Sequence, residues 1–207
     1  MKKKVLVLAV LFSAWMNAQD QYTKGMQKAF ELWGQGKPVA ASNLFERISS
    51  VELDNWLPYY YVAQVNTVMS FDEKDEARLK QQLDKAREFL ELAKVISPDN
   101  PEILVQEAMM HTAWIIFDGA TYGMTLSGKV AALYAKAIKL GPKNPRVVFS
   151  KAEWDMGAAR YFGQDLAPYC KDVERSLELF ANFKPESHFH PNWGVERAME
   201  TFEKCKG

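Results

Sequence analysis

Small and bulky apolar residues recur along the chain at fixed offsets of 0, 4, 7 and 12 positions. Offsets of 4 and 7 return to one face of an α-helix, so the pattern predicts helices with a single apolar face. The residue at offset 12 marks the helix end, most clearly where it is proline, which cannot continue a helix. Three blocks carry the pattern: Ala41, Phe45, Ile48 and Leu53; Ala86, Leu90, Ala93 and Pro98; and Val130, Tyr134, Ala137 and Pro142.

A second series of small residues predicts a partner helix before each of these helices. Ala29, Ala63, Ala108 and Ala152 are separated by 34, 45 and 44 residues. Small side chains at a helix crossing let two helices approach closely. The segments SPDNPE (97–102) and GPKNPR (141–146) carry prolines that end one helix and fit the first turn of the next. We therefore expect antiparallel helix hairpins.

The spacing of these residues resembles the tetratricopeptide repeat. The resemblance rests on Gly36, Ala41 and Phe45, on the Ala86 block and on the Tyr134–Ala137–Pro142 series, and it covers roughly residues 22–185. It implies an all-α, right-handed α-solenoid of about four hairpins, with a C-terminal helix over 191–205 that caps the last exposed face. The hairpins are expected over residues 21–52, 55–97, 101–141 and 145–184.

Only the first block keeps the 34-residue spacing of its marked alanines, and the next two blocks carry about 11 and 10 extra residues. Eleven residues are about three helical turns, so the helices can lengthen without rotating their apolar faces. We also expect longer hairpin tips, over residues 70–76, 118–129 and 161–168. A HEAT-like stack of 44-residue helix pairs is the structural alternative.

Residues 1–18 have the layout of a secretory signal peptide: Lys2–Lys4, an apolar run from Val5 to Trp15, and Ala18 before the expected cut. The run is too short to span a bilayer, so we expect an exported, periplasmic or secreted protein without stable membrane insertion after cleavage. An uncleaved anchor is the alternative. The mature chain, residues 19–207, is expected to be one domain with 26 − 3 = 23 basic and 26 acidic residues, and this balance argues against nucleic acid as a partner.

The chain has two cysteines, Cys170 and Cys205. In an exported protein such a pair can persist as a disulfide, here closing a loop of 35 residues. Two separate buried thiols are the alternative, and the sequence leaves both open.

Few residues suggest chemistry. His188 and His190, with Glu186 nearby, are a weak metal motif, because a closed site needs three or four ligands and only His111 remains elsewhere. We expect a loop that packs Phe189, no metal, no cofactor and no enzyme activity. A small-molecule site or enzyme pocket between hairpins three and four is the alternative, drawing on Trp114, Tyr122, Trp154 and Tyr161.

The resemblance implies that the first helices of the hairpins line a concave face that binds a protein or peptide. The sequence therefore predicts an exported, non-enzymatic interaction scaffold or adaptor of the cell envelope, with a partner of unknown identity. That face is either an open apolar trough or is buried against the terminal segment of the chain. The candidate partner-binding residues are Met26, Phe30, Trp33, Tyr60, Gln64, Met109, Phe149 and Glu153.

Overall fold

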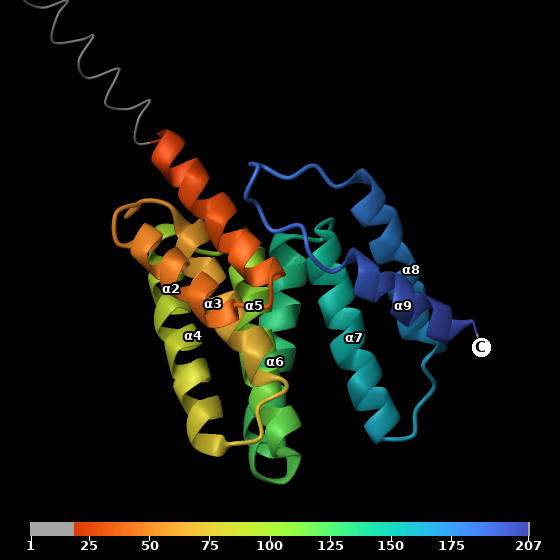
Figure 1. Ribbon diagram of the computed structural model, residues 1–207. Coiled ribbons are helices and arrows are strands. Elements are labelled where there is room, and N and C mark those ends of the chain that lie inside the picture. Colours follow the sequence, from red (N-terminus) through yellow and green to blue (C-terminus); the bar gives the residue numbers. More distant parts are fainter. Residues whose placement is uncertain (1–18, 207) are drawn as a thin grey trace, which may run out of the picture.

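The computed structural model describes residues 19–206, and every regular element within them is helical. The predicted signal peptide, residues 1–18, lies outside this range. Residues 19–34 form the first helix. The other helices are α2 (Pro38–Ser49), α3 (Trp56–Ser70), α4 (Glu76–Ile96), α5 (Pro101–Phe117), α6 (Gly119–Leu140), α7 (Pro145–Tyr161), α8 (Ala167–Asn182) and α9 (Val195–Cys205) (Figure 1).

Consecutive helices pack as antiparallel pairs, α3 with α4, α5 with α6 and α7 with α8, and the pairs stack side by side (Figure 1). This confirms the predicted all-α solenoid of tetratricopeptide-like hairpins. The marked alanines lie where the helices cross, since Ala63, Ala108 and Ala152 are almost completely buried. Within residues 19–206, no helix is both long and apolar enough to cross a membrane.

The first helices of hairpins two, three and four begin at asparagine caps. The side chains of Asn55, Asn100 and Asn144 accept hydrogen bonds from backbone N–H groups in the first turns of α3, α5 and α7. Pro101 and Pro145 occupy the first positions of α5 and α7, where a missing N–H costs nothing. The caps explain why α3, α5 and α7 begin at these residues.

Two predicted element boundaries need correction. Residues 119–129 are helical rather than a loop, because Asp118 caps α6 by accepting from the Thr121 N–H at 3.1 Å. The capping helix begins at Val195 rather than at residue 191, because Gly194 has a φ of +106°, which helix geometry excludes. The segment between α8 and α9, residues 183–194, is irregular and is here called the strap.

Candidate functional site

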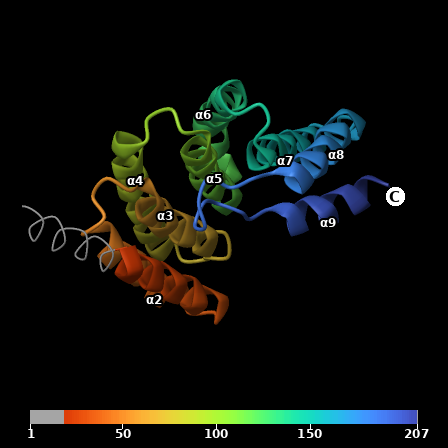
Figure 2. The ribbon, with the colours of Figure 1, turned by 90° about the horizontal axis from the view of Figure 1, so that it is seen from above.

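The strap covers the inner face of the helix stack. Figure 2 shows α4 and α6 on the outer side of the curve, while the strap crosses the inner side before it enters α9. The Tyr61 hydroxyl donates to the carbonyl oxygen of Phe189 at 2.7 Å, and the Trp193 Nε1–H donates to the Tyr60 hydroxyl at 2.9 Å. Burial, followed by the charge of Glu102, raises the pKa of both tyrosines, so both hydroxyls stay protonated.

Phe189 anchors the strap. Its side chain is 7% exposed and lies against the rings of Tyr22 and Phe30, at centroid distances of 5.5 and 6.1 Å. Aromatic pairs at these separations stabilise each other beyond the area they bury. The loop of residues 188–190 therefore packs its phenylalanine, and the described residues contain no cluster of three or more metal-ligating side chains.

The predicted partner-binding residues divide into two groups. Met26, Tyr60, Gln64 and Phe149 are buried, which fits the second of the two alternatives expected from the sequence, a face buried by the chain itself. A partner cannot reach these four side chains without a rearrangement of the structure. The other four are only partly buried, and they are Phe30, Trp33, Met109 and Glu153.

An ion pair buried under the strap links hairpins three and four. The fully buried Arg146 donates from Nε and Nη2 to the Glu102 carboxylate at 2.5–2.9 Å, and Asn144 donates to the same group at 2.6 Å. Nε2 of His190 lies 3.7 Å from Glu102. Burial alone would raise the pKa of Glu102, but the neighbouring His190 and the hydrogen bonds from Arg146 and Asn144 outweigh it and hold that pKa below its usual range.

The Arg146 guanidinium also lies over the ring of Phe183, 4.4 Å from its centroid, at the start of the strap. A buried pair of this kind is weak support for stability, but removing one partner leaves an uncompensated charge. Arg146 therefore holds Phe183, the first residue of the strap, against the start of α7.

A second buried carboxylate, Glu107 of α5, lies between hairpins two and three. Its oxygens are 2.6 Å from Lys94, 3.7 Å from Lys129 and 3.8 Å from His111. Burial would raise its pKa, but the neighbouring His111 side chain, the close contact with Lys94 and the charges of Lys94 and Lys129 lower the pKa of Glu107 to about 2. This group holds hairpins together and faces neither of the two cavities described below.

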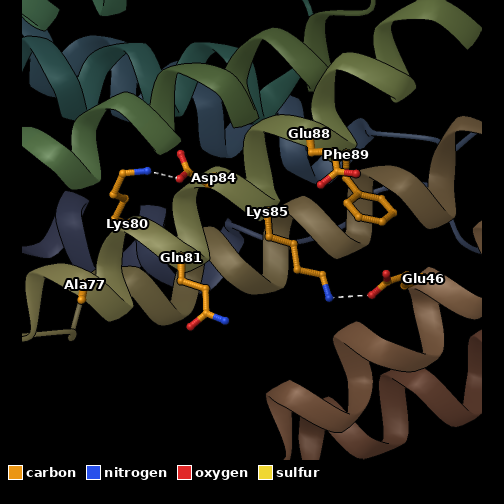
Figure 3. Close-up of a pocket in the computed structure, with 8 residues that line it drawn as sticks. All are labelled: Glu46, Ala77, Lys80, Gln81, Asp84, Lys85, Glu88 and Phe89. Carbon is orange, nitrogen blue, oxygen red and sulfur yellow. Dashed lines mark hydrogen bonds and ion pairs between the residues drawn. The ribbon is translucent and has the colours of Figure 1, made fainter.

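One cavity lies on the outer side, between α2 and α4 (Figure 3). It has a volume of about 600 Å³, but the charged side chains of its wall pair with each other. Lys85 of α4 pairs with Glu46 of α2 at 2.5 Å, and Lys80 pairs with Asp84 within α4. Phe89 at its base is buried. These pairings leave few groups for a ligand.

A second cavity, of about 250 Å³, lies where the strap crosses the starts of α3, α5 and α7. Trp56 and Phe183 contribute aromatic walls, and Glu102 and Glu186 contribute carboxylates. Sequence reasoning missed this site, because residues 183–190 show no helical periodicity that would place them over the hairpins.

The tips of hairpins three and four expose large apolar side chains at one end of the molecule, the lower end in Figure 1. Four side chains here, called the tip residues, are exposed to water: Ile116 at 62%, Met124 at 96%, Tyr161 at 85% and Phe162 at 69%. Single exposed apolar residues are normal, but several at the tips of two neighbouring hairpins make this end a candidate binding surface.

The aromatic residues predicted for a pocket between these hairpins do not all meet. Trp114 and Tyr122 pair within hairpin three at 4.8 Å, and Tyr161 pairs with Phe162 at 5.1 Å. Trp154 packs against the core of hairpin three instead. None of the four predicted residues lines either cavity. The tips therefore offer an open surface.

Cys170 of α8 and Cys205, the last residue of α9, form a disulfide with a Cα–Cα distance of 5.8 Å. The bond closes the loop that contains the strap, so both ends of the strap are tied to hairpin four. Arg197 of α9 also pairs with Glu153 of α7 at 2.5 Å.

Searches of protein-family models and of curated protein sequences found no match to this chain. Among solved structures, the chain is similar to the HusA haemophore from Porphyromonas gingivalis, with a TM-score of 0.79 and 22% identity over 89% of this chain and 92% of that one. It is also matched to a thermophilic TPR protein from Thermus thermophilus, with a TM-score of 0.41 and 14% identity over 89% of this chain and 98% of that one. The first likeness shows a shared fold over almost the whole of both chains.

Proposed function

We propose that this chain is an exported, non-enzymatic carrier that binds haem through its tip residues. The observation that carries the proposal is the exposure of Ile116, Met124, Tyr161 and Phe162 at one end of a stack whose inner face is already filled. The likeness to a haemophore over 89% of the chain supports haem as the ligand.

The chemistry of the tips suits a porphyrin. Haem is a flat apolar ring with two propionate groups at one edge. Burying a methionine or aromatic side chain against such a ring gains about 1.5–3 kcal/mol. Arg160, beside Tyr161, is exposed and makes no ion pair within residues 19–206, so its guanidinium can pair with a propionate.

Export is part of the proposal. It is supported by the signal-peptide layout of residues 1–18 and by the disulfide, because such bonds persist mainly in oxidising compartments.

The test is a titration of the mature chain with haemin, followed by visible absorbance. The double variant Met124→Ser/Tyr161→Ser should bind at least about tenfold more weakly, since two apolar contacts are lost. Val95→Ser is the matched control. Val95 is also a strongly exposed apolar residue, at 82%, but it lies at the C-terminal end of α4, away from the tips of hairpins three and four, so its loss should not affect binding. Wild-type affinity in the double variant would exclude the tip residues. Parallel titration with metal-free protoporphyrin shows whether the iron contributes.

Binding of a protein along the inner face is the second candidate. It is favoured by Met109 and Glu153, which stay partly accessible beside the strap, and by Val68, which is 40% exposed. A pull-down from the cell envelope with wild type and Met109→Asp tests it. Capture of the same proteins by a well-folded Met109→Asp variant would count against this face.

A further inference from the structure

The cavity beneath the strap is a small, built site at the opposite end of α5 from the haem-binding tips. Its volume of about 250 Å³ is below the range of drug-sized pockets, so it suits a small ligand. Two of its lining side chains, Glu102 of α5 and His190 of the strap, are buried; Glu102 accepts from Asn144 at 2.6 Å, and His190 Nε2 lies 3.7 Å from Glu102. Nothing in the proposed haem site involves these residues.

The charges around the cavity cancel. Glu102 is neutralised by Arg146 at 2.5 Å, and the exposed Lys184 and Glu186 carry opposite charges at the rim. Four first-turn N–H groups of α3, α5 and α7 that could otherwise help to hold an anion, those of Leu57, Glu102, Arg146 and Val147, already donate to Asn55, Asn100 and Asn144. Because these charges sum to about zero, a phosphate or other strongly charged ligand gains no net attraction from the cavity, even though Arg146 Nη1 keeps an unused N–H donor.

The remaining groups suit a neutral ligand with an apolar face and a hydroxyl-bearing edge. Trp56 and the face of Phe183 turned away from Arg146 offer aromatic surface. Asn100 already donates to the Ser97 hydroxyl oxygen at 3.0 Å, which leaves the Ser97 O–H as a donor and the exposed Glu186 carboxylate as an acceptor. A hydroxyl that donates to an ionised carboxylate makes a stronger bond than one between neutral groups. We infer that the cavity binds one neutral sugar ring.

The test is an NMR titration of the ¹⁵N-labelled mature chain with methyl β-glucoside, methyl β-galactoside and N-acetylglucosamine. At least one sugar should cause a saturable shift of the Trp56 indole N–H, while the Trp33 indole, which lies outside the cavity, stays in place. Inorganic phosphate and ethylamine are the charged comparators. The inference is overturned if no sugar moves the Trp56 signal, or if phosphate or ethylamine moves it more than every sugar does.

A variant pair assigns the shift to the cavity. Glu186→Ala should weaken the sugar about fivefold, the loss of one hydrogen bond at an exposed rim. Glu200→Ala on α9 is the control, because Glu200 is exposed and does not line the cavity. Equal sugar affinity in the two variants would overturn the assignment. Both variants should keep wild-type haem affinity, so failure here is distinguishable from failure of the haem proposal.

Discussion

Replacing Phe189 with alanine should loosen the middle of the strap by removing its buried ring, while the backbone carbonyl of residue 189 can still accept from the Tyr61 hydroxyl. The ring is 7% exposed and touches Tyr22 and Phe30, which belong to the first helix. The variant loses this contact but keeps the Trp193–Tyr60 hydrogen bond at one end of the strap. We expect a folded protein whose inner face is partly open to water.

The cost follows from the burial. A buried phenylalanine replaced by alanine usually costs about 3–5 kcal/mol. The strap is an irregular segment that can settle into part of the vacated space, which favours the lower end, about 3 kcal/mol. In a chain of this size each kcal/mol lowers the melting temperature by about 2–4 °C, so the expected decrease is about 6–12 °C.

Thermal unfolding followed by circular dichroism measures the effect, and binding of an apolar dye reports the opened face. Phe162→Ala is the control, because Phe162 is 69% exposed and its loss should change stability by less than about 0.5 kcal/mol. If Phe189→Ala has the same melting temperature as Phe162→Ala and binds no more dye than it does, Phe189 does not anchor the strap and the reasoning fails.

Three further predictions concern stability. The pKa of Glu107 is about 2 against an ordinary value of 4.5, so its stabilising effect is present above 4.5 and is lost as the pH falls toward 2; Glu107→Gln should therefore make the melting temperature less dependent on pH in this range. Gly194→Ala should destabilise by about 1–2 kcal/mol, because φ is +106° and the new Cβ would lie 3.2 Å from the Phe180 ring. The double variant Cys170→Ser/Cys205→Ser should lose about 3–4 kcal/mol in urea unfolding, the entropic value for a loop of 35 residues.

Each of these has its own control. An unchanged pH profile in Glu107→Gln would show that another carboxylate carries the acid sensitivity. Gly123→Ala in the second turn of α6 should stabilise by about 0.5–1 kcal/mol, because nothing lies within 4 Å of the added methyl group. If the double cysteine variant is as stable as reduced wild type, the missing disulfide accounts for its loss of stability. If oxidised wild type is no more stable than reduced wild type or the double variant, the prediction is wrong.

The helix stack could be predicted because its signal is local and periodic. Alanines such as Ala63, Ala108 and Ala152 mark the crossings, and the asparagine–proline turns mark the starts of α5 and α7. The strap could not be predicted in the same way, because its position depends on contacts across more than 100 residues, such as that of Tyr61 with Phe189. No local pattern encodes such a contact.

The repeat spacing also contains a signal for the buried ion pair. Glu102 and Arg146 are 44 residues apart, the same separation as Ala108 and Ala152. Residues one repeat apart occupy the same place in neighbouring hairpins, so opposite charges at this spacing predict an ion pair. Glu153 and Arg197 are also 44 residues apart and paired, which shows that α9 continues the register of the first helices.

The position of the disulfide determines from which end the helix stack should unfold first. Stacks of helices lose structure from their ends, because a terminal helix has a neighbour on one side only. At the C-terminal end Cys205 ties the last turn of α9 to α8, whereas within the described residues the first helix, 19–34, has no covalent link to the rest beyond the chain itself. Amide exchange under native conditions should therefore start in the N-terminal hairpin and progress toward the tethered end.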